Sequence, residues 1–336
     1  MNIKNLLLII GFCCLLTSCE KSTNLKSFTA MNTFMTITSY GKNCNEANKK
    51  VEKKIFELEN KFSTTKKNSL IYKINNSNEK SFSLDDDTYR VIKFGLDMAD
   101  KTDGVLNIAL YPIVKAWGFT TEDYKVPSEA EINQLLPLTD YKQLQLDFYK
   151  KLICMNPKMM IDLGALGKGY AGDESIKILK EYGIISGILN FGGNIQTIGS
   201  KPDGSDWKIG VKNPFDNSVA LGIEVCNKAV ITSGGYERNF TTKDGKTYIH
   251  IFDSKTGRPV ENEVASVTIV SESGLYGDGL STSMFALGVE KAFDYWKNAR
   301  DFEMAIITKK SQLFYTAGLK NKISLIYDFD EISIIE

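Results

Sequence analysis

The sequence predicts an α+β protein whose main part is a single domain. Segments with the pattern of strands and of helices follow one another irregularly along the 336 residues, without the regular βα repeat of a doubly wound sheet. No internal repeat, low-complexity tract or Pro/Gly-rich linker divides residues 29–336. Hydrophobic residues make up 43% and charged residues 24%, which is ordinary for a globular protein with a full core.

The first half of this domain is predicted to contain one strand and three helices. Residues 34–40, FMTITSY, have the pattern of a strand. Helices are expected within 46–63 and over 87–101. A third, short helix opens where Ser128 and Glu131 form a capping-box pattern. In the first helix, apolar residues recur at i, i+4, i+7 and i+11 on one face, namely Val51, Ile55, Leu58 and Phe62.

The second half is predicted to be rich in strands. Residues 187–199, GILNFGGNIQTIG, form an apolar strand pattern broken by a Gly-Gly turn. Residues 266–273 alternate like a strand. Residues 303–310 and 322–329 are expected to close the chain as further strands.

The N-terminus has the pattern of a lipoprotein signal. Lys4 precedes the apolar run LLLIIGFCCLL, which is too short to span a bilayer and fits the apolar part of a signal peptide. The residues LTSC that follow resemble a bacterial lipobox, so we expect 1–18 to be removed and Cys19 to carry lipid, with 19–28 as a polar tether. Lipid would hold the mature protein on a membrane surface. The alternative is an ordinary secretory peptide that has a cysteine at this place by chance.

Charge and cysteine content exclude some classes of function. The 41 basic residues balance 41 acidic ones, so no net charge attracts nucleic acid, and no nucleic-acid partner is expected. Cys44, Cys154 and Cys226 lie far apart in the mature domain and match no CxxC spacing for metal or redox chemistry. Three separate buried thiols are expected, with one disulfide as the alternative.

A glycine-rich segment, IDLGALGKGYAGD over 161–173, is predicted to run from the end of a strand through a loop into a helix. Such a loop lets backbone N–H groups approach an anion at the helix N-terminus. GKGYAG matches GxGxxG, but no βαβ unit follows, and Lys168 is followed by glycine rather than by the Ser or Thr of a Walker A loop. A phosphate loop and a tight turn with a solvated lysine both remain open.

Oxygen donors stand close together in GDGLSTS over 277–283. Asp278, Ser281 and Thr282 offer a carboxylate and two hydroxyls in what is expected to be a flexible turn, and Mg²⁺ prefers such ligands. The alternative is a helix N-cap in which Asp278 or Ser281 binds free N–H groups.

The chain has a single histidine, His250, in TYIHIFDSKTGRPV, with Asp253 nearby. Histidine suits proton transfer near neutral pH, but a lone histidine in an apolar strand also fits a hydrogen-bonded core residue. Upstream, ITSGGYERNF over 231–240 places Tyr236 and Arg238 beside a Gly-Gly turn, where ordinary packing and an ordinary ion pair are the alternatives to a site.

Together these stretches resemble the ApbE family of flavin transferases over about residues 30 to 290. MNT at 31–33 stands where the family has M-G-T, and TDGVLNIALYPIVKAWGF at 102–119 is similar to its T-D-G-x-x-D…P…WGF block. IDLGALGKGYAGD is similar to its DLGxxxKGxxxD block. LNFGGNI, WKIGVKNP, TSGGYER, HIFDSKTGRPV and GDGLSTSMFALG follow in the family's order, and members with a lipobox are common.

The resemblance implies an enzyme, a Mg²⁺-dependent FAD:protein FMN transferase. Such an enzyme binds FAD as substrate, attaches the FMN half through a phosphoester to a threonine of an acceptor flavoprotein, and releases AMP. Acceptors include flavin-carrying subunits of membrane redox complexes, which fits a lipid-anchored protein on the extracytoplasmic face of the cell envelope. The resemblance also implies a single compact α+β domain with mixed or antiparallel sheets and flanking helices.

Binding residues follow from the same resemblance. Asp278 and Thr282 match the family's side-chain metal ligands, and the carbonyl of Ala165 matches its backbone ligand. The positions that match the family's FAD contacts are Met31, Val105, Leu106, Asn107, Asp162, Lys168 and Phe252.

Three residues are expected to be catalytic. His250 matches a histidine that lies near the metal and the pyrophosphate in the family. We expect it to supply or orient the base that activates the threonine hydroxyl, together with Asp253. Lys168 is expected to neutralise the charge that develops on the phosphates.

Five positions depart from the family's pattern. Asn32 replaces the glycine of M-G-T, and Asn107 replaces the aspartate that follows T-D-G-x-x. Thr65 stands where many members carry an aromatic residue. Gly235 replaces an acidic residue, and Ser254 replaces a proline. Since the metal positions are kept, these departures are expected to affect FAD affinity more than the chemistry.

Three other functions stay open. With water in place of threonine, the same residues would make the protein an FAD pyrophosphatase that yields FMN and AMP. An FAD-binding lipoprotein that stores or delivers the flavin would not need a metal at the pyrophosphate. A surface lipoprotein without a small-molecule site would bind no flavin.

Overall fold

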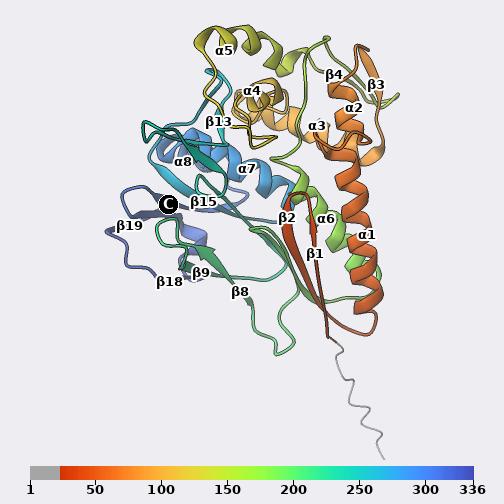
Figure 1. The fold of residues 1–336 in the computed structure, drawn as a ribbon. Helices are drawn as coiled ribbons and strands as arrows, with labels where there is room; N and C mark the ends of the chain where they lie inside the picture. The colour runs from red at the N-terminus through yellow and green to blue at the C-terminus, as the bar shows by residue number, and fades with distance from the viewer. Residues whose placement is uncertain (1–22) are drawn as a thin grey trace, which may run out of the picture.

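The computed structural model describes residues 23–336, and a nine-stranded sheet forms the centre of this part of the chain (Figure 1). Neighbouring strands run antiparallel, apart from the parallel pair at the C-terminal edge. The expected α+β domain with a mixed sheet is therefore confirmed. The strands, in the order in which they neighbour one another, are β1 (Thr23–Ala30), β2 (Thr33–Tyr40), β6 (Ser186–Phe191), β7 (Asn194–Ile198), β10 (Ala229–Gly234), β15 (Val264–Ser271), β16 (Glu303–Thr308), β17 (Gln312–Thr316) and β19 (Glu331–Ile335).

Helices cover one face of this sheet. They are α1 (Cys44–Phe62), α6 (Gly167–Glu181) and α7 (Gly274–Leu287), with α8 (Val289–Ala299) beside α7. The apolar stripe of α1 lies inward as the sequence predicted, since Val51, Ile55 and Leu58 are fully buried. The strand expected over 34–40 is confirmed as β2.

A small second sheet covers the opposite face. It consists of β8 (Trp207–Lys212), β9 (Val219–Val225) and β18 (Ile323–Leu325). Trp207 and Leu221 of this sheet share a core with Val270 and Ile307 of the large sheet. β15, expected from the alternation over 266–273, is therefore buried on both faces, and its β-branched residues suit that position.

The remaining elements gather at one end of the sheet, shown at the top of Figure 1. The helix expected over 87–101 is confirmed as α3, and the capping box of Ser128 and Glu131 is present at the start of α5. These elements are α2 (Leu70–Asn75), α3 (Asp86–Lys101), α4 (Tyr111–Ala116), α5 (Glu129–Leu135), the 3₁₀ turns Leu136–Thr139 and Tyr141–Gln143, the small sheet β3 (Ser81–Ser83), β5 (Leu152–Cys154) and β4 (Gln145–Asp147), and the hairpins β11 (Asn239–Thr241) with β12 (Thr247–Ile249) and β13 (Phe252–Asp253) with β14 (Arg258–Pro259).

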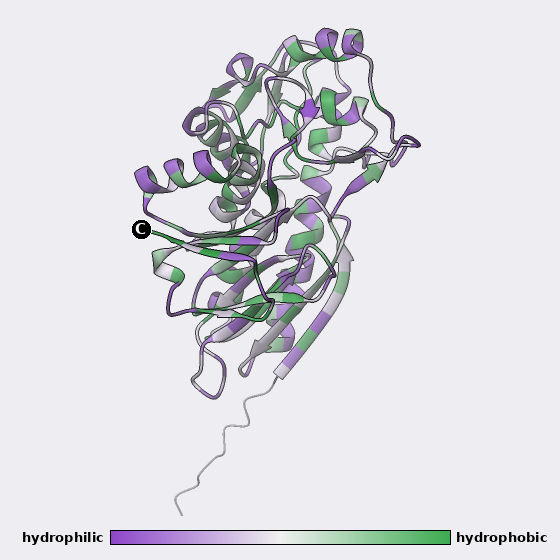
Figure 2. Ribbon diagram, turned by 90° about the vertical axis from the view of Figure 1, so that its left-hand side faces the viewer, coloured by the Kyte–Doolittle hydropathy of each residue, from purple (hydrophilic) through white to green (hydrophobic). Residues whose placement is uncertain are grey.

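The segment expected as a polar tether over 19–28 is a strand from Thr23 onward. This strand, β1, pairs with β2 along its whole length. Its side chains alternate between exposed and half-buried because one of its faces packs against α1. Hydropathy does not follow this alternation, since the apolar Leu25 is on the exposed face, and Figure 2 shows hydrophilic and hydrophobic residues mixed along the strand. The expected signal peptide 1–18 and the expected lipidation at Cys19 lie outside the described residues.

Three further expectations differ from the structure. Residues 161–163 form no strand and lead into α6 as a loop. Of the strand expected over 322–329, only the three residues of β18 are regular. No disulfide joins the three cysteines within residues 23–336, as expected, but only Cys44 is buried, whereas Cys154 and Cys226 are partly exposed.

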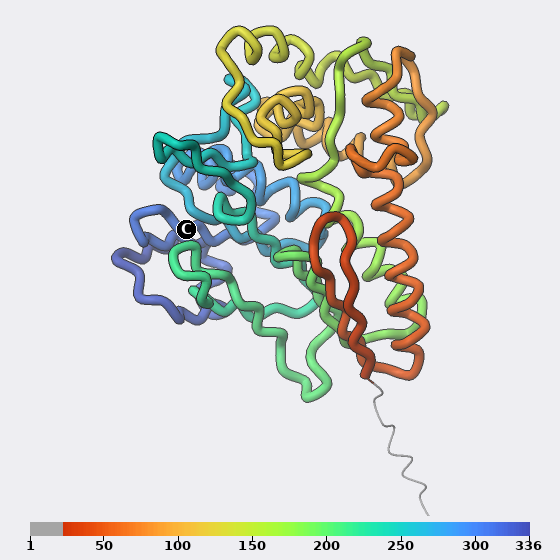
Figure 3. The backbone as a smooth tube through the Cα atoms, in the orientation of Figure 1, coloured from red at the N-terminus to blue at the C-terminus, as the bar shows by residue number. Residues whose placement is uncertain are grey.

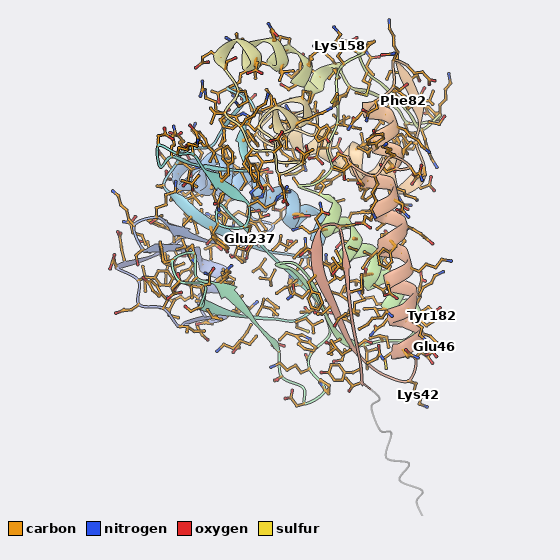
Figure 4. The ribbon with its side chains drawn as sticks, viewed as in Figure 1. Lys42, Glu46, Phe82, Lys158, Tyr182 and Glu237 are labelled. Carbon is orange, nitrogen blue, oxygen red and sulfur yellow. The ribbon has the colours of Figure 1, made fainter. Side chains whose placement is uncertain are left out.

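Helix α1 runs along the molecule from one end toward the other, as Figure 4 shows. Lys42, Glu46 and Tyr182 lie together at the end where β1 begins, and Phe82 lies at the opposite end. Glu237, which lies shortly before β11, is between these ends. No helix within residues 23–336 has the length and the apolar character needed to cross a membrane.

Candidate active site

The N-termini of α6 and α7 meet at one point, and glycines allow the close approach. A Cβ on Gly169 would lie 2.8 Å from the Cβ of Asp278, and a Cβ on Gly274 would lie 2.7 Å from the Gly169 carbonyl oxygen. Gln196 on β7 donates its Nε2 to that same carbonyl at 3.1 Å, and a Cβ on Gly172 would collide with it. Gly169 and Gly172 of GKGYAG therefore serve helix packing, and α6 already begins at Gly167, the first glycine of this motif.

Each of these helices is capped by a carboxylate from the other. Asp278 accepts the N–H of Gly169 in the first turn of α6 at 2.8 Å. Asp173 accepts the N–H groups of Gly274 and of the next residue at 2.6 and 3.0 Å, and the hydroxyl of Ser273 at 2.7 Å. Carboxylates are stabilised at helix N-termini by the free N–H groups and by the helix dipole. The two caps therefore fix α6 and α7 against each other.

Asp278 and Thr282 lie in α7 and not in a flexible turn. The N-cap of α7 is Ser273, rather than Asp278 or Ser281 as the sequence allowed. Thr282 follows Asp278 by one helical turn, so both side chains are on one face. Ser281 donates to the Asp278 carbonyl at 3.0 Å, whereas the Thr282 hydroxyl makes no hydrogen bond to any residue within 23–336. The carboxylate and this hydroxyl remain together as oxygen donors.

At the N-terminus of α6, the Lys168 ammonium and the Asp278 carboxylate lie in the same region. Burial raises the pKa of Asp278 to about 6, while the Lys168 charge, the Gly169 N–H and the Asn194 amide act in the opposite direction. Lys168 lies half-buried in the first turn of α6 and forms no ion pair with the residues that the structure describes. An ammonium and a helix N-terminus favour an anion at this place, and the carboxylate favours a cation.

His250 is held in one tautomer by the carbonyl of Arg238. Its Nδ1 lies 3.0 Å from that oxygen, and its backbone N–H donates to the same oxygen at 3.1 Å. Because a carbonyl oxygen only accepts, Nδ1 carries the proton and Nε2 keeps a free lone pair. The pKa of His250 is lowered to about 4, mainly by burial and to a smaller extent by the charges of Arg238 and Lys168, against the opposing effect of the hydrogen bond to the Arg238 carbonyl. The ring is therefore neutral at neutral pH and open to a proton at Nε2.

Asp253 and Phe252 have partners other than His250. Asp253 accepts the N–H of Lys255 at 2.8 Å in the turn between β13 and β14. No hydrogen bond among the described residues links Asp253 to His250, so the expected pair is not formed. Phe252, expected to contact FAD, has its ring 5.7 Å from that of Phe119 inside an aromatic core.

The turn between β1 and β2 holds Met31 in the left-handed region. Its φ is +49° and that of Asn32 is +58°, as in the tight primed turns of hairpins. Asparagine tolerates this conformation, which accounts for Asn32 in place of glycine. The Met31 N–H donates to Glu59 of α1 at 2.8 Å, and Figure 3 shows the hairpin lying against that helix. A Cβ on Gly192 would lie 2.9 Å from that of Thr33, so the β6–β7 turn packs beside this one.

Val105, Leu106 and Asn107 lie between α3 and α4. Leu106 is buried and Val105 is half-buried. The Asn107 amide donates to the Thr139 carbonyl at 2.8 Å and accepts the Ala109 N–H at 2.8 Å, so it holds this loop together. Asn107 also lines a cavity of about 280 Å³. The residue that replaces the family's aspartate is therefore engaged with the backbone.

Asp162 and Ala165 lie in the loop before α6. Asp162 accepts the N–H of Gly164 at 2.9 Å, and burial raises the pKa of Asp162 against the opposing charge of Arg238. The charge of Arg238 acts on Asp162 and on His250 alike, so the loop and the histidine strand face one guanidinium. Ala165 is half-buried two residues before α6 begins.

The other departures from the family pattern have local roles. Ser254 donates to the Gly104 carbonyl at 2.6 Å, a bond that proline does not make. A Cβ on Gly235 would lie 3.1 Å from the side chain of Ile249, so a larger residue needs a shift there. Thr65 lies in the turn after α1, where its N–H and hydroxyl approach one serine, and nothing in the structure explains the absence of an aromatic ring.

Sequence reasoning missed four polar residues of this region. Asp173 is the last residue of the segment IDLGALGKGYAGD, but its role depends on a helix that starts 101 residues later. Gln196 and Asn194 follow the Gly-Gly turn, and that turn could have indicated that the next strand carries residues of a site. Glu59 lies on the polar side of α1, where nothing local distinguishes it from a solvated acid.

Known proteins are similar to this chain in sequence. The model of the ApbE family matches residues 31–306. The chain is 34% identical over 225 residues to an FAD:protein FMN transferase of Klebsiella pneumoniae (strain 342), covering 66% of this chain and 69% of that protein. It is 31% identical over 308 residues to the FAD:protein FMN transferase of Buchnera aphidicola subsp. Schizaphis graminum (strain Sg), covering 88% and 89%.

Solved structures are similar over nearly the whole described chain. The ApbE protein from Thermotoga maritima MSB8 superimposes with a TM-score of 0.84 at 29% identity, covering 90% of this chain and 99% of that one. The flavin transferase ApbE from Vibrio cholerae gives a TM-score of 0.81 at 26% identity, with the same coverage. The family model, the similar sequences and the fold thus agree, and this chain belongs to the ApbE family.

Proposed function

We propose that this protein is an FAD:protein FMN transferase that moves FMN from FAD to a threonine hydroxyl of an acceptor flavoprotein, with Mg²⁺, and releases AMP. The names of its relatives support the transferase activity. The observation that carries the proposal is the meeting of the α6 N-terminus, Lys168 and Asp278 at one point. A pyrophosphate with bound Mg²⁺ would complement these charges, because the anion suits the helix N-terminus and Lys168 and the cation suits Asp278.

The donor set of the site fits Mg²⁺. Asp278 and Thr282 offer a carboxylate and a free hydroxyl on one face of α7, and the Ala165 carbonyl precedes α6. All three are oxygen donors, and a set with one carboxylate leaves room for phosphate oxygens and water. Residues 23–336 contain no cluster of three or more His, Cys, Asp or Glu side chains that would suit another metal better. When bound, Mg²⁺ would neutralise negative charge on the pyrophosphate.

His250 suits the proton transfer in this reaction. The threonine oxygen forms a new bond to the phosphorus of the FMN half, and the anhydride bond to the AMP phosphate breaks. The hydroxyl proton passes to Nε2 of His250, which the Arg238 carbonyl leaves free by holding Nδ1. Such a base typically contributes about 10²–10⁴-fold to the rate. Lys168 places a positive charge where the leaving AMP gains a negative one.

The experiment follows AMP release and the intact mass of an acceptor that carries a threonine, with the purified protein, FAD and Mg²⁺. Acceptor-dependent AMP release with an added mass of FMN is the expected result. AMP release without acceptor would instead mean an FAD pyrophosphatase, and tight FAD binding without AMP would mean a carrier. His250→Gln should lose most of the rate, whereas Asp253→Asn, which keeps a turn-forming side chain, should retain it.

We also propose that lipid on Cys19 holds the protein at the extracytoplasmic face of a membrane, where the acceptor is a flavin-carrying subunit of a redox complex. The sequence LTSC after an apolar run supports this placement. Two lipid signals hold a protein far more stably than one. Cys19→Ala should move the protein from the membrane fraction to the soluble fraction and abolish labelling by a radioactive fatty acid. Unchanged fractionation would contradict the anchor.

A further inference from the structure

Asn194 carries a buried carboxamide that makes no well-formed hydrogen bond. It is 1% exposed, and neither its Oδ1 nor its Nδ2 meets the geometry of a hydrogen bond to a described residue, although the amide lies near enough to Asp278 to oppose the rise in the pKa of that carboxyl. Within residues 23–336 it is the one side chain with two such atoms. Buried amides are nearly always hydrogen-bonded, because an unpartnered one loses its bonds to water without replacement. We therefore expect the Asn194 carboxamide to form a hydrogen bond in another state of the protein, such as one with a ligand bound.

The strand geometry directs this carboxamide toward α7. Asn194 and Gln196 are two residues apart on β7 and face the same side of the sheet, and Gln196 reaches the start of α6. Asn194 also lies opposite Ile231 of β10, and a Cβ on Gly277 of α7 would lie 2.9 Å from the Ile231 side chain. Asn194 therefore lies beneath the second turn of α7, next to Asp278.

We propose that Asn194 is a positioning residue that orients Asp278 for cation binding, by donating its Nδ2 to the Asp278 carboxylate when the cation is bound. This inference rests on the proposed function, since it concerns the carboxylate assigned to Mg²⁺. Gly169 already holds one oxygen of Asp278 from the α6 side. A second donor from the sheet side fixes the rotation of the carboxylate, which leaves its remaining lone pairs for the cation. Loss of such a partner typically lowers metal affinity by about 10–100-fold.

Asn48 offers a matched control. It is also a fully buried asparagine, but its amide is satisfied: it accepts from Ser39 at 2.8 Å and donates to the carbonyl and side-chain oxygens of Asn24 at 3.1 and 2.8 Å. Leucine has nearly the shape of asparagine and no polar atoms. Asn194→Leu therefore removes an unpartnered group, whereas Asn48→Leu removes three hydrogen bonds.

The test measures the melting temperature during titration with MgCl₂, and with MnCl₂, in the absence of FAD. We expect Asn194→Leu to melt no lower than the wild type without cation, and to need about 10–100-fold more cation for half of its stabilisation. Asn48→Leu should melt lower without cation and keep the wild-type cation requirement. A structural role alone would shift the melting temperature and leave the cation requirement unchanged.

An unchanged cation requirement in Asn194→Leu, with a clear shift in the wild type, would overturn this inference alone. A wild type that neither cation stabilises would overturn the inference together with the metal part of the proposed function, and FMN transfer that persists in EDTA would confirm that failure. If Asn194→Leu does not fold, Asn194→Ala and direct Mn²⁺ binding by electron paramagnetic resonance decide the same question with the same expected loss of affinity.

Discussion

Asp173 of α6 and Asp278 of α7 cap each other's helices, with hydrogen bonds of 2.6 to 3.0 Å in both directions. The carboxylate proposed to bind the cation is thus also the cap of the helix that carries Lys168. A change in the angle between α6 and α7 would move Asp278 and Lys168 relative to each other. The fold therefore links the stability of this helix pair to the geometry of the site.

Replacing Asp173 tests this link. Asp173→Ala removes three hydrogen bonds at the start of α7 and should lower the free energy of unfolding by about 0.5–2 kcal/mol, as for the loss of an N-cap. It should also reduce FMN transfer, because α7 carries Asp278 and Thr282. Urea unfolding and the transfer rate measure the two effects. Asp173→Asn keeps part of the hydrogen bonding and should fall between the wild type and the alanine variant.

The contact between the helices leaves no room for a methyl group on Gly169. Gly169→Ala would place a Cβ against the Gly274 carbonyl and 2.8 Å from the Cβ of Asp278, which should destabilise the fold by about 1–3 kcal/mol. Denaturant unfolding measures the loss. Gly210→Ala is the control, because its Cβ would meet only the two Val219 methyl groups, at 3.3 and 3.6 Å. Equal stability of the two variants would contradict the close packing.

The hairpin turn at Asn32 should accept glycine but should be destabilised by alanine, because its φ is positive. Asn32→Gly keeps the φ of +58° at no steric cost, so its stability should match that of the wild type. Asn32→Ala should lower the free energy of unfolding by about 1 kcal/mol, because alanine lacks the short polar side chain with which asparagine tolerates the left-handed region. Thermal unfolding of both variants checks this. Weaker FAD binding by Asn32→Ala would further connect the turn with the flavin.

The pH dependence of stability should report on His250. Its pKa is lowered to about 4 in the fold from an ordinary value of 6.5, so between these values the unfolded chain binds a proton that the folded chain does not. The stability associated with neutral His250 is complete above pH 6.5 and declines as the pH falls toward 4. The wild type should therefore lose more stability over this range than His250→Gln. Parallel pH profiles of the two proteins would refute the lowered pKa of this ring.

The Thr282 hydroxyl should matter for the cation and not for the fold. Thr282→Val keeps the shape and removes a hydroxyl that bonds to no described residue, so the melting temperature without cation should stay within error. The Mg²⁺ concentration for half-maximal AMP release should rise by about tenfold or more. Ser283→Ala is the control on the same helix, because that hydroxyl already donates to the Gly279 carbonyl at 2.7 Å. It should leave the Mg²⁺ requirement unchanged.

The sequence by itself determined the elements whose pattern is local. The four apolar residues of α1 recur on one helical face, and Ser128 with Glu131 marks the start of α5 within four residues. The family motifs also brought Asp278, Thr282, Lys168 and His250 together as one candidate site. The helix signals depend on side chains a few positions apart, whose backbone geometry is nearly independent of the rest of the chain, whereas the site residues were grouped by the resemblance to the family.

Only the tertiary structure decided which partners these residues have. β1 read as a polar tether because it is an edge strand with one exposed face, and its pairing with β2 is not a local property. Asp278 reaches Gly169 across 109 residues, and the tautomer of His250 depends on the Arg238 carbonyl in a different segment. Such contacts depend on how elements pack, because burial and the direction of a distant helix set the hydrogen bonds and the pKa values, and a local sequence pattern holds no information on either.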